Sequence, residues 1–257
     1  MQSTNSSDNL TPAGPDSQFL GRLVHELRSP AHAISCFLDI YEKSTRDLKL
    51  PEDASEAIGI IERSSGDLRL LLRSLSRYAH SFDAKQIQSL SLANLVNSAW
   101  LEVQRKHADV EGARLVTDGI DIEIMADELA FANALHCIFD NTLRYRSQDR
   151  QLQVDVRADR SGQLIRLSIE DNGIGIQSEF LHKCYQPFGR LHARHLYPGA
   201  GLGIPTATNC LQHVHGQLRI ESTFGSGTMV HMEFNPAVAV PNEHCASLPS
   251  DSSHDES

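Results

Sequence analysis

Four short blocks in this chain carry residue types that could move a phosphoryl group. The first places an imidazole beside a carboxylate, at His25-Glu26, and the second is Asn141, which follows an aspartate inside an otherwise apolar run. The third and fourth are the glycine-rich segments 171–175 and 199–203. Glycine lets a backbone approach a nucleotide closely because it has no Cβ. Together the blocks indicate transfer of a phosphoryl group from ATP to a histidine of the chain itself.

His25 is the candidate phosphate acceptor. It falls at the heptad position farthest from the apolar seam of its helix, so its ring is expected to face water, where a triphosphate can reach it in line. Glu26 is expected to hold the imidazole tautomer or to accept its proton. Pro30 removes a backbone donor and is expected to bend the helix below the histidine. Taken alone, a helical His-Glu pair is more often a solvated surface pair, and the downstream blocks favour the catalytic interpretation.

Asp171 is the candidate for recognising the base. It follows an alternating strand, and a carboxylate fixed there could accept the exocyclic amine of adenine and so discriminate against guanine. Gly173 and Gly175 are expected to let the turn pass close beneath the ring. An ordinary hairpin turn is the alternative for an Asp-Asn-Gly sequence considered alone.

The second glycine-rich block leads into a predicted helix with Pro205 in its first turn, where the missing amide hydrogen costs little. Free N–H groups and the helix dipole bind anions at such an N-terminus. We therefore expect the phosphates to lie against Gly199, Gly201, Leu202 and Gly203.

Asn141 is a candidate ligand for the Mg²⁺ that ATP carries, the alternative being a buried asparagine with a hydrogen-bond partner. Arg144 and Tyr145 follow one turn later and are expected to reach a phosphate and to pack near it. The segment 189–198 is expected to form a mobile lid, in which Arg190 is the candidate for steadying the γ-phosphate. The alternative is that Arg190 is an ordinary solvated loop residue.

The first elements that must position these blocks are two helices. Apolar positions recur three and four residues apart from Leu20 to Tyr41, and again from Ile58 to Phe82. Two such helices joined by a short loop form an antiparallel hairpin, expected over 17–84, that covers only part of its apolar stripe. Pairing with a second copy into a four-helix bundle would cover the rest, so the sequence predicts a homodimer. The alternative is a monomer whose hairpin packs on its own second domain.

From about residue 92 the pattern changes to alternating helices and strands. The predicted helices cover 92–107, 127–146 and about 202–215, and the predicted strands cover 120–124, 152–156, 165–169, 218–220 and 230–234. We expect a mixed sheet with helices on one face over 85–235. The fold class is therefore α+β, with a dimeric helical hairpin followed by an α/β sandwich. The tails 1–16 and 236–257, rich in Ser, Asp and Pro, are expected to be disordered.

Composition narrows the class of protein. A formal net charge of −10 disfavours a duplex nucleic-acid partner, which would require a basic face. The 5 cysteines are widely spaced and never form a Cys-x-x-Cys pair, which indicates reduced thiols in a cytoplasmic protein. No apolar run of about 18 residues exists, so no membrane span is expected. Only about 16 residues precede the first helix, too few for a sensory domain. Any input is therefore expected to come from another chain, such as a separate sensor or regulatory protein, or from a surface of this one, and the alternative is that the sequence is a fragment of a longer protein.

The four blocks, in this order, resemble the H, N, G1 and G2 boxes of the sensor histidine kinase family. Residues 185–188, Tyr-Gln-Pro-Phe, resemble its F box, and the similarity covers about residues 17–235. The resemblance implies a dimerisation and phosphoacceptor hairpin followed by a Bergerat-type ATP-binding domain. It also implies that ATP and Mg²⁺ are the cofactors, that His25 is phosphorylated with help from Glu26, and that a response regulator receiver domain accepts the phosphoryl group on an aspartate.

The chain departs from that family's pattern at two positions. Cys137 stands where the N box normally begins with a second Asn, and a thiol is a poor ligand for hard Mg²⁺. Ser29 stands where relatives with phosphatase activity tend to have Thr or Asn, which leaves dephosphorylation of the regulator open. A catalytically silent scaffold of the same fold is therefore an alternative function. Another ATPase with the same pocket, of the chaperone or mismatch-repair type, is a third, against which the heptad hairpin with His25 argues.

Overall fold

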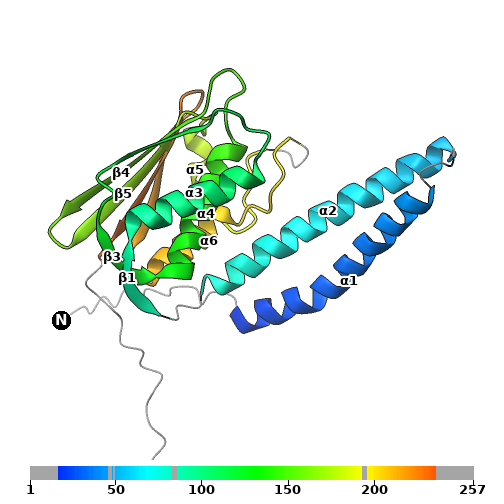
Figure 1. Cartoon of the computed structure of the whole chain (residues 1–257), viewed down its shortest axis with the longest axis horizontal. Coiled ribbons are helices and arrows are strands. Elements are labelled where there is room, and N and C mark those ends of the chain that lie inside the picture. Colours follow the sequence, from blue (N-terminus) through cyan, green and yellow to red (C-terminus); the bar gives the residue numbers. More distant parts are fainter. Residues whose placement is uncertain (1–16, 46–47, 49, 83–85, 193–195, 236–257) are drawn as a thin grey trace, which may run out of the picture.

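The computed structural model describes residues 17–45, 48, 50–82, 86–192 and 196–235 of the chain. A long helical hairpin extends from a separate domain in which helices cover a sheet (Figure 1). This arrangement confirms the predicted fold, in which a hairpin precedes an α/β sandwich. The two predicted tails and the predicted boundary between residues 84 and 85 lie outside the described residues.

The hairpin consists of α1 (Ser17–Thr45) and α2 (Glu52–His80), and α1 continues through Pro30 without interruption. Val24 and Ala31 of α1 face α2 and are each 2% exposed. Further along the same stripe, the hydroxyl oxygens of Ser35 and Ser65 lie 3.0 Å apart in the interior. Ser35 also donates to the Ala31 carbonyl, so its buried hydroxyl has partners on both helices.

The other apolar face of α1 is exposed. The heptad positions predicted from Leu20 to Tyr41 lie one residue before the stripe that contacts α2, and one residue turns a helix by about 100°. Hence most of the predicted seam faces solvent in the single chain. The exposed apolar side chains of α1 are Phe19, Leu23, Leu27, Ile34, Phe37, Ile40 and Tyr41.

The second domain is built on a five-stranded sheet with the order β2-β4-β5-β7-β6. Its strands are β2 (Arg114–Asp118), β4 (Gln153–Ser161), β5 (Leu164–Asp171), β6 (Gln217–Thr223) and β7 (Gly227–Phe234). The β2–β4 pair is parallel, and the other neighbours are antiparallel. A separate antiparallel pair joins β1 (Ile87–Ser91) to β3 (Glu123–Asp127). The two predicted hairpins are therefore β4–β5 and β6–β7.

Three helices cover one face of the sheet (Figure 1): α3 (Leu92–Lys106), α4 (Glu128–Arg144) and α6 (Gly203–Gln212). A 3-10 turn (Ser178–Phe180) and the short α5 (Leu181–Cys184) follow β5. Alternate residues of the strands point at these helices, and Val154, Leu167 and Phe234 are fully buried. Because each of the three helices offers one apolar stripe, the domain has a single core between the two layers.

The predicted strand over 120–124 was misplaced. Ile122 donates to the Ile120 carbonyl over 2.8 Å, which makes a tight turn, and the strand begins only at Glu123. The strands β1 and β2 were not predicted at all. Both are short, and most of their side chains are exposed or partly exposed, so neither shows a clear alternation of apolar residues.

An apolar contact joins the hairpin to the second domain. Val24 of α1 and Leu75 and Tyr78 of α2 form a small buried cluster with Ala200 and Leu202, which lie just before α6. This contact places the second glycine-rich block against the turn of α1 that carries His25.

Polar contacts extend the same interface. The Ser81 hydroxyl accepts from Asn209 over 3.2 Å, and His213 Nε2 lies 2.8 Å from the Ser81 carbonyl oxygen. Arg77 of α2 reaches His136 of α4, with 3.0 Å between Nη1 and Nδ1. The end of α2 is thus held by α4 and α6 together.

Two findings bear on the compositional expectations. Within the described residues, no helix combines the length and the hydrophobicity that a bilayer crossing requires. Cys36, Cys137, Cys184 and Cys210 are unpaired thiols, and Cys245 lies outside the described residues.

Candidate functional site

A pocket lies between α4, α6 and one end of the sheet. It encloses about 850 Å³, counting its open mouth. Among the residues singled out from the sequence, the pocket is lined by Asn141, Tyr145, Asp171, Gly175, Arg190, Gly201 and Gly203. Its apolar walls come from Ile138, Ile174, Ile176, Ile204, Ile220 and Val230. The structure therefore brings together residues from the N, G1 and G2 blocks.

Asp171 is the last residue of β5 and lies at the inner end of this pocket. Its Oδ1 accepts from the backbone N–H of Gly173 over 2.8 Å and of Thr228 over 3.3 Å. Burial raises the pKa of the carboxyl to about 6, against the opposing effect of these hydrogen bonds. A carboxylate in this setting is fixed in orientation and is charged at neutral pH.

The turn after Asp171 requires glycine. A Cβ at Gly173 would lie 2.6 Å from the Tyr145 carbonyl oxygen and 2.8 Å from Asp171 Oδ1. Gly175 has φ +66°, and a Cβ there would lie 2.1 Å from the Thr223 carbonyl oxygen. The backbone of this turn is therefore packed too closely for any side chain.

Arg150 holds the same turn from outside and was not singled out from the sequence. Its guanidinium donates to the carbonyls of Asn172 at 2.6 Å, Gly173 at 2.7 Å and Gly225 at 2.8 Å. It therefore ties the β5 turn to the β6–β7 hairpin. Its surroundings in the sequence are a polar loop, which gives no indication of this role.

The second glycine-rich block packs against two polar side chains of α4. A Cβ at Gly199 would lie 2.5 Å from Arg144 Nη1, and one at Gly203 would lie 3.4 Å from Asn141 Nδ2. Gly201 has φ +69°, which favours glycine. The helix α6 begins at Gly203 without a side-chain cap, so its first amides have no side-chain acceptor.

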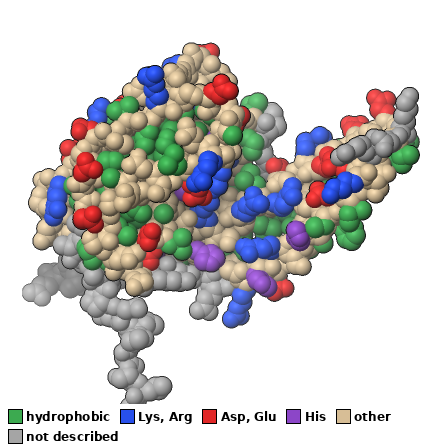
Figure 2. Space-filling view, in the orientation of Figure 1, with side chains coloured by type: hydrophobic (Ala, Val, Ile, Leu, Met, Phe, Trp, Pro, Cys, Tyr) green, Lys and Arg blue, Asp and Glu red, His purple; other side chains and the backbone are tan. Residues whose placement is uncertain are grey.

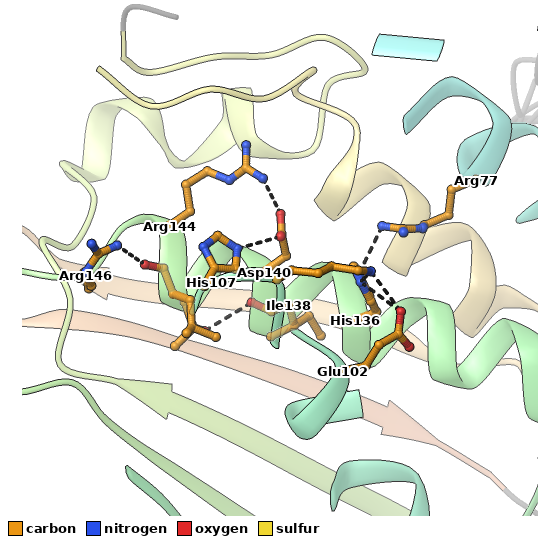
Figure 3. Close-up of polar contacts among 11 residues, drawn as sticks. Arg77, Glu102, His107, His136, Ile138, Asp140, Arg144 and Arg146 are labelled. Carbon is orange, nitrogen blue, oxygen red and sulfur yellow. Dashed lines mark hydrogen bonds and ion pairs between the residues drawn. The ribbon is translucent and has the colours of Figure 1, made fainter. Parts of the chain in front are cut away.

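Arg144 is held in place by a partly buried carboxylate (Figure 3). Asp140 accepts from Arg144 Nη2, and its other oxygen lies 3.0 Å from His107 Nε2. Burial alone would raise the pKa of Asp140, but the hydrogen bond from His107 and the charge of Arg144 lower it to about 2. Arg144 Nε is buried and has no hydrogen-bond partner among the described residues. The guanidinium thus keeps a free donor beside the glycine-rich loop.

Aromatic rings lie at the mouth of the pocket. The centroid of the Tyr145 ring lies 5.1 Å from that of Tyr197 and 5.9 Å from that of His192. Arg190 donates to the Tyr197 carbonyl over 3.0 Å, so it belongs to the same cluster. The neighbouring lid residues Arg194 and His195 lie outside the described residues.

His25 lies outside this pocket, on the exposed side of α1. Its side chain is 84% exposed, as the heptad position predicted, and Nδ1 is 3.5 Å from Glu26 Oε1. Leu202, predicted to contribute to the phosphate loop, turns its side chain into the contact with the hairpin and does not line the pocket.

The comparisons with known proteins agree with this geometry. Residues 16–81 match the family model described as the His Kinase A (phospho-acceptor) domain. Residues 126–238 match the model described as the Histidine kinase-, DNA gyrase B-, and HSP90-like ATPase. The chain belongs to the sensor histidine kinase family.

Individual relatives of this chain are distant in sequence. The chain is 27% identical over 219 residues to Sensor protein RprX of Bacteroides fragilis, and the match covers 82% of this chain and 41% of RprX. It is 28% identical to the Non-motile and phage-resistance protein of Caulobacter vibrioides, and that match covers 83% of this chain and 26% of that protein. The chain therefore spans less than half the length of these relatives.

A solved structure shares the fold of this chain. It is full-length ShkA in complex with AMPPNP, with a TM-score of 0.64 and 18% sequence identity over 88% of this chain and 47% of ShkA. At that identity the likeness concerns the fold alone.

The departure at Cys137 lies away from the pocket. The thiol is 4% exposed, and it is not among the residues that line the pocket. Burial raises its pKa, with the charge of Arg77 opposing. Cys137 therefore contributes a neutral buried side chain at the face of α4 that approaches α2.

A second polar cluster joins the hairpin to α3 and α4 (Figure 3). His136 receives Arg77 at Nδ1, while Lys106 lies at its Nε2 and the Glu102 carboxylate lies 3.7 Å away. Burial lowers the pKa of His136 to about 4, and the charges of Arg77 and Lys106 lower it further in the same direction. The ring is therefore neutral at physiological pH. This cluster was not predicted, because it forms only where α2, α3 and α4 pack together in the folded chain.

Proposed function

We propose that this chain is an ATP-dependent protein-histidine kinase that phosphorylates His25. We further propose that it passes the phosphoryl group to an aspartate of a response regulator receiver domain. The observation that carries the first proposal is the contact between the glycine-rich loop and α1. Ala200 and Leu202 pack on Val24, so the border of the nucleotide pocket touches the helical turn that bears His25.

The proposed nucleotide is ATP. Asp171 would accept the exocyclic amine of adenine, and the apolar walls and Tyr145 would enclose the base. The phosphates would lie toward the first amides of α6, where Arg144 Nε has no partner in the described chain. Arg190 lines the pocket from the lid side and would reach the terminal phosphate. Asp171, Tyr145 and Arg190 all line the same pocket, which supports this placement of the nucleotide.

We propose that Mg²⁺ enters with the nucleotide. The described residues contain no group of three or more His, Cys, Asp or Glu that could hold a metal ion by themselves. Mg²⁺ in nucleotide sites is commonly held by phosphate oxygens, water and only one or two protein ligands. The Asn141 amide lies beside the first residue of α6 and fits that single role. When bound, the ion would neutralise charge on the phosphates.

The proposed reaction uses the ring nitrogen of His25 that faces away from Glu26. Glu26 lies next to Nδ1, so it stabilises the tautomer with hydrogen on Nδ1 and leaves the Nε2 lone pair free. Nε2 would attack the γ-phosphorus, forming the P–N bond as the bond to the bridging oxygen breaks and ADP leaves. The Nδ1 proton would pass to Glu26 and then to water, which leaves a neutral phosphorylated imidazole.

The arrangement described here keeps the two reactants apart, because His25 does not line the nucleotide pocket. Transfer therefore requires the α/β domain to leave its contact with the hairpin, or requires the histidine of a second copy. We propose a homodimer, since α1 exposes a continuous apolar face that includes Phe37 at 71%. Phe37→Asp should yield monomers by light scattering, and an unchanged mass would count against this face.

The regulator, and any separate sensor or regulatory protein, would act on this dimer. Since ATP is the proposed donor, we place the reaction in the cytoplasm. The proposed transfer is tested by mixing the phosphorylated chain with a receiver domain. Label should move to the receiver and should be absent from a receiver whose phosphoacceptor Asp is replaced by Asn.

Incubation with γ-labelled ATP and Mg²⁺ tests the kinase proposal. We expect acid-labile label on the chain, none on His25→Gln, and normal label on His182→Gln, an exposed histidine of the other domain. Asn141→Asp should also abolish labelling while leaving the dimer intact, and retained labelling would contradict the metal assignment.

Two results of this assay would support other functions. Nucleotide binding without label would support a scaffold. Sustained phosphate release without a phosphoprotein would support another ATPase.

A further inference from the structure

A second cavity is a groove on the surface of the hairpin, outside the nucleotide pocket. It lies between α1 and α2, and its residues are His25, Arg28, Ser29, Ala31, His32, Arg69, Leu72 and Arg73. Ala31 and Leu72 are 2% and 5% exposed and form its floor. The groove and the nucleotide pocket share no lining residue.

The groove gathers positive charge in an acidic protein. The chain has a formal net charge of −10, yet no Asp or Glu is among the lining residues, while Arg28, Arg69 and Arg73 are. Basic and histidine side chains lie close together along the hairpin in Figure 2. Because a guanidinium stays protonated at every physiological pH, these charges are permanent.

Two of these arginines have no partner in the described chain. Arg28 donates to the Ser76 hydroxyl over 3.4 Å, whereas Arg69 and Arg73 make no hydrogen bond or ion pair with any described residue. They lie four residues apart on α2, where like charges repel each other. This placement is unfavourable unless an anion enters the groove.

We propose that the groove between α1 and α2 holds the phosphoryl group once it is attached to His25. This inference rests on the proposed function, in which His25 is the acceptor. A phosphoryl group carries nearly two negative charges and three acceptor oxygens. Arg69 and Arg73 supply free donors facing α1, and Arg28 adds charge from the same side as the histidine. The arginines act as positioning residues that stabilise the phosphorylated form and set the orientation in which the phosphoryl group meets its acceptor.

Chemical phosphorylation tests the groove without ATP. Phosphoramidate transfers its phosphoryl group to histidine and releases ammonia, so the nucleotide site is not needed. The resulting signal is followed by ³¹P NMR across pH, and the signal that disappears in His25→Gln is assigned to His25. Protein phosphoryl groups lose their second proton near pH 6. The basic groove should lower that midpoint by roughly half to one pH unit relative to a free phosphohistidine.

Variants on α2 show whether the arginines cause the shift. In the double variant Arg69→Gln/Arg73→Gln the midpoint should return toward the free value, and Arg69→Lys/Arg73→Lys should retain part of the shift. Arg63→Gln is the matched control, because Arg63 is exposed on the same helix and does not line the groove. A midpoint equal to that of free phosphohistidine in the unaltered chain would overturn the proposal, as would an identical midpoint in the double variant.

If a variant does not fold, the salt dependence of the titration midpoint in the unaltered chain still tests the proposal. Raising NaCl from low concentration to about 0.5 M should move the midpoint upward, because salt screens exposed charges. A midpoint that does not change with salt would contradict the proposal. The groove proposal and the kinase proposal can fail separately. If only the kinase proposal is wrong, ATP leaves no label on the chain, but the chemically phosphorylated chain still shows the shifted midpoint.

Discussion

His25 and His136 are both helical histidines with a glutamate nearby, and their surroundings give them opposite properties. His25 Nδ1 lies 3.5 Å from Glu26, with both side chains more than four-fifths exposed. His136 Nε2 lies 3.7 Å from Glu102, but its own side chain is 8% exposed and lies between two cations. Spatial proximity to an acid therefore does not by itself define a role for a histidine.

The same contrast separates the two regions of the chain. In the α/β domain, charged groups such as Asp140 and Asp171 are partly buried and fixed by several hydrogen bonds. On α1, His25 is held by one exposed contact and is free to meet a moving partner. Recognition of a nucleotide needs fixed groups, whereas accepting a phosphoryl group needs access. We expect substitutions in the first region to change binding or stability and substitutions in the second to change reactivity alone.

The largest effect is expected at the buried carboxylate of the nucleotide pocket. Asp171→Asn should weaken binding of AMPPNP by about 100-fold, because a charged acceptor for the adenine amine is lost. Asp118→Asn, at an exposed position of β2, should bind normally. Calorimetric titration measures both affinities. If Asp171→Asn bound as tightly as the unaltered chain, the assignment of this residue to the base would be wrong.

A smaller effect is expected on stability when the carboxylate that supports Arg144 is changed. Asp140→Asn should lower the free energy of unfolding by about 2–3 kcal/mol, because His107 and Arg144 lose a buried charged partner. Glu26→Gln should leave the unfolding curve unchanged, since both groups of its pair are exposed. Urea unfolding followed by circular dichroism gives the two values. If Asp140→Asn and Glu26→Gln lowered the free energy of unfolding equally, the contrast drawn between the α/β domain and α1 would be wrong.

The pH dependence of stability should reveal His136. Its folded pKa of about 4 is below the ordinary value, so the unfolded chain takes up the proton first as the pH falls. The stability that the neutral ring provides is complete above about pH 6.5 and is lost between pH 6.5 and 4, by roughly 1–3 kcal/mol. The difference between the unfolding curves of the unaltered chain and His136→Gln isolates this contribution. His25→Gln should retain it, and a His136→Gln curve parallel to the unaltered one would contradict the prediction.

The smallest effect concerns nucleotide affinity and pH. With a pKa of about 6 in the unliganded chain, Asp171 is mostly ionised at pH 7 and mostly protonated at pH 5. AMPPNP affinity should therefore fall roughly five- to tenfold between pH 7 and pH 5. Because the folded pKa of Asp171 lies above its ordinary value, the protonated carboxyl stabilises the unliganded fold. The free energy of unfolding should therefore fall as pH rises through 6. The AMPPNP affinity of Asp171→Asn should not change between pH 7 and pH 5. If it fell as much as that of the unaltered chain, the pH dependence would belong to another group.

Periodicity was sufficient to predict most of the architecture. The helices α1, α2, α3 and α4 and the hairpins β4–β5 and β6–β7 have strong apolar repeats, and each was found close to its predicted position. The exposure of His25 was also predicted, because a heptad position fixes the direction of a side chain. The stripe that α1 presents to α2 was missed by one residue, since α1 has two adjacent apolar stripes and the sequence alone does not say which neighbour each one meets.

The residues that support the pocket were beyond sequence reasoning. Arg150 and His107 lie in polar stretches without periodic signal, and they act only through contacts made by distant segments. The contact between Arg77 and His136 joins two residues that lie 59 positions apart in the sequence. Glycine blocks are recognisable because the backbone itself requires them, whereas a supporting side chain is defined by what folds against it.

The glycine-rich loop before α6 has two sides, with the pocket on one and the hairpin on the other. Gly201 and Gly203 line the pocket, while Ala200 and Leu202 are buried against Val24 and Leu75. The loop is therefore the segment through which occupancy of one side would be coupled to occupancy of the other. If docking of the hairpin changes the affinity for nucleotide by some factor, nucleotide must change the docking equilibrium by the same factor. A five-residue segment therefore lets the loaded and empty forms of the domain differ in how readily they release the helix that carries the reactive histidine.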